Sequence, residues 1–409
     1  MSPEDPISGG DLLVSGIGEL ATIDPANEGT LGLVGAAALV IRDGRVVWAG
    51  RESDLPSAGG DLPELDVAGR AVLPGFVDAH THVVFGGDRS DEFARRLAGE
   101  SYEQTMAAGG GIMSTVAATR GATDGELADS ARRRLTKMLA TGTTTVEVKS
   151  GYGLDLETER RMLDVVAQLD SDLAIDIVPT FLGAHVVPPE WRDDRAGYVQ
   201  FVIDEMLPAC APSARFCDVF CDDGAFAVDE ARLILEAGKR HGLEPRLHAD
   251  QLAHTGGTAL AAEVGALSAD HLDQATPRDL AALAEAGTVA VLLPGVSFTM
   301  RLPYPDQARF AAAGVPVALA TDANPGTSYV LTMPFIIALA ALNMGMAPAA
   351  AVWSATRGGA LALDEADKGW LGPGAVADAV VLDAPSHLHL PYRPDDDVVW
   401  KVIKSGRLV

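Results

Sequence analysis

The feature that most constrains the fold of this 409-residue chain is an alternation of apolar, strand-like segments with helix-like segments. Strands that alternate with helices form parallel sheets, and eight of them favour a closed barrel over an open, doubly wound sheet. We therefore predict an α/β protein built on a (β/α)8 TIM barrel. The predicted strands are Ala71–His82, Thr143–Lys149, Ala174–His185, Cys217–Phe226, Glu244–Asp250, Ala266–Leu272, Thr288–Gly295 and Pro316–Asn324.

Helical periodicity characterises the segments between these strands. In such barrels the chemistry lies at the loops that follow the carboxyl ends of the strands. Candidate functional residues are therefore sought there. The predicted helices are Asp124–Thr141, Glu157–Leu169, Asp229–His241, Gly256–Val264 and Arg278–Ala286.

Both ends of the chain have a different pattern, with short alternating segments separated by turn residues. Asp43-Gly44 between two apolar runs indicates a hairpin, and Ser405-Gly406 indicates a second turn near the end of the chain. We expect the two ends to assemble into one small β-sandwich domain. The predicted division is residues 1–73 and 366–409 for this domain and 74–365 for the barrel.

Charge and cysteine content limit the partners and the compartment. A net charge of −26 argues against nucleic acid or an anionic membrane surface as a partner. Residues 1–10 are acidic and lack the apolar core of a signal peptide, which predicts a cytoplasmic protein. The three cysteines make a disulfide framework improbable. Cys217 and Cys221 could form a metal pair, but ordinary buried cysteines are the more common case.

Two histidines, His80 and His82, follow the apolar run at residues 71–77. Side chains at positions i and i+2 of a strand point to the same face, so both imidazoles can reach one metal ion. On its own, a His-x-His pair is weak support for a metal site.

Further ligand-type residues follow other predicted strands. His248 ends the fifth, His271 ends the sixth and Asp322 ends the eighth. A lone histidine on an apolar strand is more often a core residue. Five such residues at the correct ends of four strands predict a mononuclear metal site with room for a water molecule.

Longer motifs give a family resemblance that covers the whole barrel. The barrel, the split β domain and the His-x-His pair resemble the amidohydrolase superfamily, and within it the chain is similar to the imidazolonepropionase family. The segments that carry the narrower resemblance are Phe85–Phe93, Ala108–Ile112, Glu147–Leu154, Thr180–His185, His248–Gln251, Ser268–His271, Leu293–Gly295 and Ala320–Thr327.

This resemblance implies a reaction, a cofactor and a set of site residues. The reaction is hydrolysis of the small anion 4-imidazolone-5-propanoate to N-formimidoyl-L-glutamate, and the assembly is a homodimer. One divalent metal per chain, zinc or iron, is implied on His80, His82, His248 and Asp322. The implied substrate site consists of Arg89, Tyr152, His185 and Gln251, with Asn324, Gly326 and Thr327 at the product end.

The chemistry of three of these side chains agrees with the implied roles. Arg89 suits a propanoate carboxylate, although an exposed surface arginine is the alternative. Tyr152 lies between two glycines and can hydrogen-bond to the substrate or simply pack. His185 can donate to the carbonyl or the developing oxyanion, or it can cap the segment before Pro188.

His271 is the predicted base that deprotonates the attacking water, because the ordinary pKa of histidine lies near neutrality. Asp322 could also accept this proton while it binds the metal, and the sequence does not show which of the two residues does so. Gln251 stands where many relatives carry a glutamate three residues after the fifth-strand histidine. An amide cannot shuttle a proton, which counts against a ring deaminase.

Two rival functions remain open from the sequence. A dihydroorotase-like or hydantoinase-like enzyme with two metals would need a carboxylated lysine after the fourth strand, and residues 219–224 contain none. A binding protein that kept the barrel but lost the chemistry would fail to bind a metal.

Overall fold

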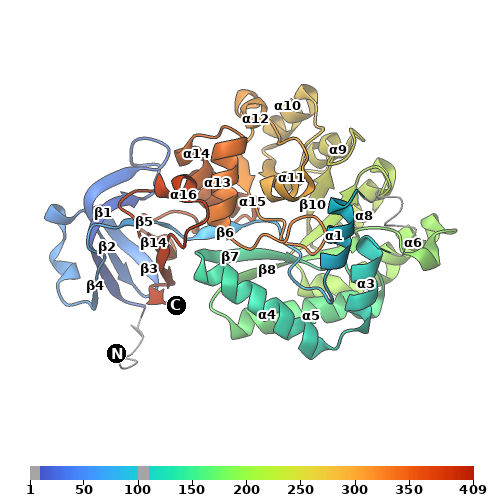
Figure 1. Cartoon of the computed structure of the whole chain (residues 1–409), viewed down its shortest axis with the longest axis horizontal. Helices are drawn as coiled ribbons and strands as arrows, with labels where there is room; N and C mark the ends of the chain where they lie inside the picture. The colour runs from blue at the N-terminus through green and yellow to red at the C-terminus, as the bar shows by residue number, and fades with distance from the viewer. Residues whose placement is uncertain (1–9, 100–109) are drawn as a thin grey trace.

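The computed structural model describes residues 10–99 and 110–409, which form two sheets with helices around one of them (Figure 1). Ala108 and Gly109, which begin the glycine-rich segment of the family resemblance, lie outside the described residues. Within the described ranges, no helix is both long and apolar enough to cross a membrane.

The larger sheet is a barrel of eight parallel strands in chain order, as predicted. Asp322 N–H donates to the carbonyl of His80 at 3.0 Å, and His82 N–H donates to that of Ala323 at 2.9 Å. These bonds join the segments that follow the first and last strands. The barrel strands are β6 (Phe76–Asp78), β7 (Thr143–Lys149), β8 (Asp176–Ala184), β9 (Phe216–Cys221), β10 (Glu244–Ala249), β11 (Ser268–His271), β12 (Val289–Leu292) and β13 (Val317–Leu319).

The smaller sheet is mixed and is built from both chain ends, also as predicted. Its strand order is β16-β15-β14-β5-β1-β2-β3, with β4 paired to β1, and it lies to the left of the barrel in Figure 1. Its strands are β1 (Leu12–Ala21), β2 (Leu33–Arg42), β3 (Arg45–Arg51), β4 (Glu64–Asp66), β5 (Ala71–Pro74), β14 (Ala379–Leu382), β15 (Val399–Lys404) and β16 (Arg407–Leu408).

Two tight turns of this sheet confirm the turn residues read from the sequence. Asp43 and Gly44 join β2 to β3, and both have positive φ angles of 50° and 71°. Ser405 and Gly406 join β15 to β16 with φ angles of 47° and 76°. Two successive positive φ angles twist the chain in the sense that antiparallel strands require.

The prediction of one continuous strand over Ala71–His82 is wrong. The chain forms β5 in the mixed sheet and then β6 in the barrel, and it crosses between the sheets at Gly75. A Cβ at Gly75 would overlap the side chain of Thr144, so only glycine fits at this crossing. We propose that the barrel unit begins here and ends near residue 365, after the last helix that covers it.

Helices surround the barrel, and their first turns show why they start where they do. Thr123 accepts from Glu126 N–H and Thr276 from Asp279 N–H, each within a capping box that satisfies otherwise unpaired amides. The helices are α1 (Ser90–Leu97), α3 (Ile112–Gly121), α4 (Asp124–Ala140), α5 (Leu156–Asp172), α6 (Arg195–Phe201), α7 (Leu207–Cys210), α8 (Val228–Arg240), α9 (Gly257–Glu263), α10 (Pro277–Ala286), α11 (Pro294–Met300), α12 (Gln307–Ala313), α13 (Met333–Asn343), α14 (Pro348–Trp353), α15 (Gly359–Ala362) and α16 (His389–Tyr392).

An ion cluster ties the two units together. Lys404 of β15 lies 2.7 Å from Asp176, the first residue of β8, and 2.9 Å from Asp378. Lys368 lies 2.9 Å from Asp176 as well. The cluster therefore lies at the amino end of β8, the end opposite to the strand termini where the chemistry is expected.

Candidate functional site

Four predicted metal ligands come together at the carboxyl ends of the barrel strands. Nε2 of His82 lies 3.3 Å from Nε2 of His80 and 3.4 Å from Nε2 of His248. Oδ1 of Asp322 lies 3.5 Å from Nε2 of both His80 and His82. The four side chains come from three segments that are distant in the sequence, and all four residues are buried.

These separations fit a metal ion. Tetrahedral ligands at about 2.0–2.1 Å from a metal lie about 3.3–3.4 Å from one another. A single proton can join only two of the imidazole Nε2 atoms. A cation shared by all of them can accept the lone pair of each. The donor set of three imidazoles and one carboxylate therefore fits a divalent metal.

The ring tautomers support the same conclusion. Nδ1 of His80 lies 2.7 Å from Oδ2 of Asp270, and Nδ1 of His248 lies 3.0 Å from Oδ2 of Asp218. A carboxylate accepts hydrogen bonds, so Nδ1 of His80 carries the proton and its Nε2 keeps its lone pair, and the carboxylate of Asp218 beside Nδ1 of His248 favours the same tautomer there. Such carboxylates orient imidazole ligands in metal sites.

Burial keeps the site in the protonation states that a metal needs from its imidazoles. Removal from water lowers the pKa of His80, His82 and His271 well below the usual range, so these rings are neutral near pH 7. Burial also raises the pKa of Asp322 to about 7, so its charged form needs a nearby cation for stabilisation.

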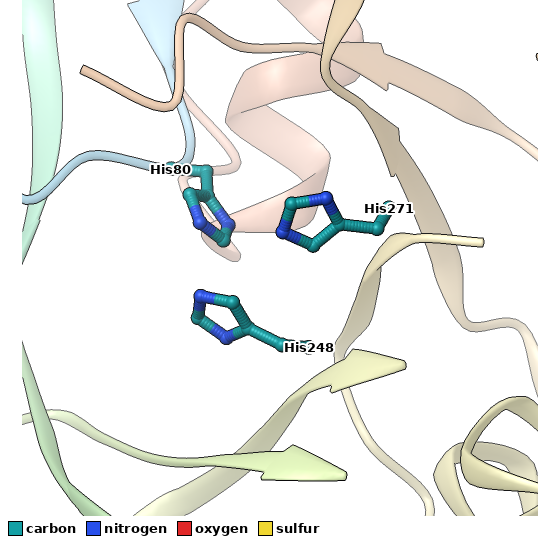
Figure 2. A group of neighbouring side chains, drawn as sticks. All are labelled: His80, His248 and His271. Atoms are coloured by element: carbon teal, nitrogen blue, oxygen red, sulfur yellow. The ribbon is translucent and has the colours of Figure 1, made fainter. Parts of the chain in front are cut away.

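His271, the predicted base, lies beside the same space. Its ring centre is 5.5 Å from that of His80 and 5.4 Å from that of His248 (Figure 2). The three rings point toward one another, and their nitrogens also satisfy the spacing of a metal-binding group. Nδ1 of His271 is buried and has no hydrogen-bond partner among the described residues. The position suits either a base or an additional ligand.

Two predicted substrate residues line the other side of the histidines. The ring of His185 stacks on that of His82 at 5.3 Å, and the ring of Tyr152 lies 5.5 Å from that of His185. Nδ1 of His185 lies 3.0 Å from the carbonyl oxygen of Gly151. Burial raises the pKa of Tyr152, so its hydroxyl stays protonated.

The loop after β13 brings the predicted product-end residues close to Arg89. Oδ1 of Asn324 accepts from the N–H groups of Gly326 and Thr327, each at 2.8 Å, and this shapes the loop. A Cβ at Gly326 would overlap the guanidinium of Arg89. Arg89 also forms an ion pair with Glu92 of α1. The arginine is thus near the site, but half of its fork is already engaged.

Gln251 follows β10 with a partly exposed side chain. Its backbone N–H donates to Oδ2 of Asp222 at 2.6 Å, and the same oxygen accepts from Leu252 N–H at 2.8 Å. Asp222 therefore fixes the path of the loop on which Gln251 lies.

Five buried charged residues near the histidines were not predicted. They could have been found as charges inside apolar strands: Arg246 lies two residues before His248, and Glu147 and Lys149 are two residues apart. They are Glu147, Lys149, Asp218, Arg246 and Asp270.

The cysteine alternative finds no support in the structure. Cys217 and Cys221 are free and buried, and burial raises the pKa of the Cys221 thiol to about 12. Among the described residues, no cysteine belongs to a group of three ligand-type side chains.

Comparisons with known proteins show the family of the chain. Residues 71–409 match the model of the amidohydrolase family. The chain is 49% identical over 399 residues to the imidazolonepropionase of Mycolicibacterium smegmatis, covering 97% of each chain. It is 51% identical to that of Salinispora arenicola over 97% of this chain and 98% of the relative. Among solved structures, a zinc-bound adenosine deaminase from Xanthomonas campestris has a TM-score of 0.73 at 18% identity, with coverage of 97% and 92%.

Proposed function

From the premise that this chain belongs to the amidohydrolase family, and within it to the imidazolonepropionases, we propose how its own residues perform the reaction. The enzyme hydrolyses the cyclic C–N bond of 4-imidazolone-5-propanoate to give N-formimidoyl-L-glutamate. The observation that carries the proposal is the clustering of the donor atoms around His80 and His82. Nε2 of His82 lies 3.3 Å from that of His80 and 3.4 Å from that of His248, and Oδ1 of Asp322 lies 3.5 Å from Nε2 of both His80 and His82.

His80, His82, His248 and Asp322 would hold the metal, because Nε2 of His82 lies close to those of His80 and His248 and Oδ1 of Asp322 lies close to those of His80 and His82. A bound divalent metal lowers the pKa of water to about 7 and polarises the substrate carbonyl. His271 would take the proton from the attacking water and then pass it to the leaving ring nitrogen.

His185 would accept a hydrogen bond rather than donate one. Because the carbonyl of Gly151 can only accept, Nδ1 of His185 carries the proton. Burial lowers the pKa of His185 to about 3, so the ring is neutral and Nε2 keeps a lone pair. We therefore assign Nε2 to a ring N–H of the substrate, and the donor role to the hydroxyl of Tyr152. This differs from the oxyanion role expected from the sequence.

Arg89 would bind the propanoate carboxylate. Glu92 engages Nε, at 3.1 Å, and Nη2, which leaves Nη1 on the side of Gly326 for the substrate. Asn324 and Thr327 would support this contact by holding Gly326 in place. A strongly acidic protein repels an anionic substrate, and the guanidinium of Arg89 supplies a local positive charge that attracts it.

Replacing Gly326 by alanine tests this arrangement. The new methyl group would displace the guanidinium, so we expect KM to rise about tenfold or more, as for the loss of one hydrogen bond to a charged group. We expect kcat to change less. Gly121→Ala is the matched control, because a Cβ there meets no atom within 4 Å. Steady-state kinetics with an unchanged KM for Gly326→Ala would contradict the role of Arg89.

We also infer one zinc or iron ion per chain, a cytoplasmic location and a homodimeric assembly. Elemental analysis of the purified protein tests the first point, with about one metal per chain expected. Two metals per chain would favour the binuclear rival, and no metal after growth with both would overturn the proposed site. Sedimentation equilibrium tests the dimer.

A further inference from the structure

A cluster of buried charges lies directly behind two of the proposed metal ligands. Its members are fully buried, and they come from four strands of the barrel, three of which are consecutive in the sheet. They are Glu147 and Lys149 of β7, Asp218 of β9, Arg246 of β10 and Asp270 of β11.

The ammonium of Lys149 is the centre of this cluster. Its Nζ lies 2.7 Å from Oε1 of Glu147, 2.8 Å from Oδ2 of Asp218 and 3.6 Å from Oδ2 of Asp270. An ammonium has three N–H donors and is a compact point charge, so it suits three carboxylates around one point.

The carboxylate oxygens near Lys149 are the same atoms that contact the histidines. Oδ2 of Asp218 is also the atom 3.0 Å from Nδ1 of His248, and Oδ2 of Asp270 is the atom 2.7 Å from Nδ1 of His80. A displacement of either oxygen would therefore turn an imidazole.

Glu147 connects Lys149 to the His-x-His segment itself. Its other oxygen, Oε2, accepts from the backbone N–H of Thr81 at 3.2 Å, and Thr81 lies between His80 and His82. The backbone N–H of Lys149 also donates to the carbonyl of Thr81 at 3.0 Å. The cluster is thus joined to the backbone of the ligands as well as to their rings.

Arg246 cannot replace the ammonium of Lys149. Its Nη2 is 3.3 Å from Oδ2 of Asp270, but the same guanidinium donates to the backbone carbonyls of Ala79 at 2.7 Å and Ala362 at 3.1 Å. Among the described residues, its guanidinium forms an ion pair with Asp270 but not with Asp218 or Glu147. Without Lys149, these two carboxylates would face each other in a buried space with no cation between them.

We propose that Lys149 is a positioning residue of the metal centre, which holds Asp218 and Asp270 where they orient His248 and His80. This inference rests on the proposed function only for the identity of the metal ligands. Loss of an outer partner of a ligand weakens metal binding about 10–100-fold. Lys149 acts through two such partners.

The test is the metal affinity of Lys149→Met, measured by competition with a chromophoric chelator for Zn²⁺. We expect the affinity to fall at least about tenfold. We also expect the visible spectrum of the Co²⁺-loaded variant to change, because the imidazoles turn. The matched control is Lys404→Met, which removes another buried lysine. Lys404 lies between Asp176 and Asp378, near the amino end of β8 and away from the proposed metal site. The control should bind Zn²⁺ as the unmodified protein does.

A second variant covers the case in which Lys149→Met does not fold. The double variant Lys149→Met/Glu147→Gln removes one positive and one negative charge, so the net charge of the cluster stays the same. The glutamine oxygen can still accept from Thr81 N–H. The inference expects weakened Zn²⁺ binding and an altered Co²⁺ spectrum in this folded variant.

The outcomes separate the inference from the proposed function. Unchanged affinity and an unchanged Co²⁺ spectrum in either folded Lys149 variant would overturn the positioning role while the metal site stands. Failure of the unmodified protein to bind Zn²⁺ at all would overturn the proposed function itself. An equal loss of affinity in Lys404→Met would assign the effect to general destabilisation and would also overturn the inference.

Discussion

Replacement of His271 by alanine is expected to leave the metal bound and to lower kcat about 10²–10⁴-fold, the usual contribution of a general base. The ring lies 5.4–5.5 Å from those of His80 and His248, close enough to reach a water held between them. Because its ring is neutral at pH 7, it has a lone pair for the proton. Single-turnover rates and the metal content of the same sample provide the measurement.

The metal content decides between the two roles that this position allows. His80, His248 and His271 together have the spacing of a ligand group, so His271 could also bind the metal. A His271→Ala protein that loses the metal would show that the residue is a ligand. One that keeps both the metal and full activity would remove it from the mechanism and leave the proton transfer to Asp322.

Replacement of His248 by alanine is expected to abolish both metal binding and turnover. This residue supplies one of three clustered Nε2 atoms, and Asp218 holds its ring in place. Loss of a ligand should exceed the 10–100-fold effect of an outer partner, so we expect the Zn²⁺ affinity to fall more than about 100-fold. The lost charge stabilisation of several kcal/mol corresponds to about 10³-fold or more in rate.

His254→Ala is the natural control for this substitution. His254 lies six residues further on, in the loop after β10. Its side chain is 48% exposed and pairs with Asp279 at 2.9 Å rather than with the clustered histidines. Its replacement should leave the Zn²⁺ affinity unchanged. A chelator titration in which both variants bind Zn²⁺ as well as the unmodified protein would exclude His248 as a ligand.

The sequence predicted the barrel because the periodicity of apolar residues reports burial directly. β7 begins at Thr143 and ends at Lys149, as expected, and the two hairpin turns have the backbone that their residues require. The crossing at Gly75 was missed because one apolar run serves two sheets in succession. Local pattern cannot distinguish that from one long strand, since both segments are buried.

The site was predictable to the extent that its chemistry follows from residue type. His80 and His82 follow β6 and converge as their spacing predicted, but the proton on Nδ1 of His185 depends on a carbonyl 34 residues away in the chain. The ion pair between Arg89 and Glu92, which the sequence did not predict, also leaves fewer N–H groups of the guanidinium free for the substrate carboxylate. The charge of Lys149 inside an apolar strand was visible in the sequence, but its role was not, because Asp218 and Asp270 are brought to it only by the fold.

The measurement that most directly decides whether this chain is a metal-dependent hydrolase of this kind follows the ultraviolet absorbance of freshly generated 4-imidazolone-5-propanoate. Three samples are compared: metal-replete protein, the same protein stripped by a chelator, and stripped protein to which Zn²⁺ or Fe²⁺ is restored. We expect rapid decay with appearance of N-formimidoyl-L-glutamate in the first and third samples, and only the spontaneous rate in the second. Decay at the spontaneous rate in all three samples, with metal content verified, would contradict the proposed function.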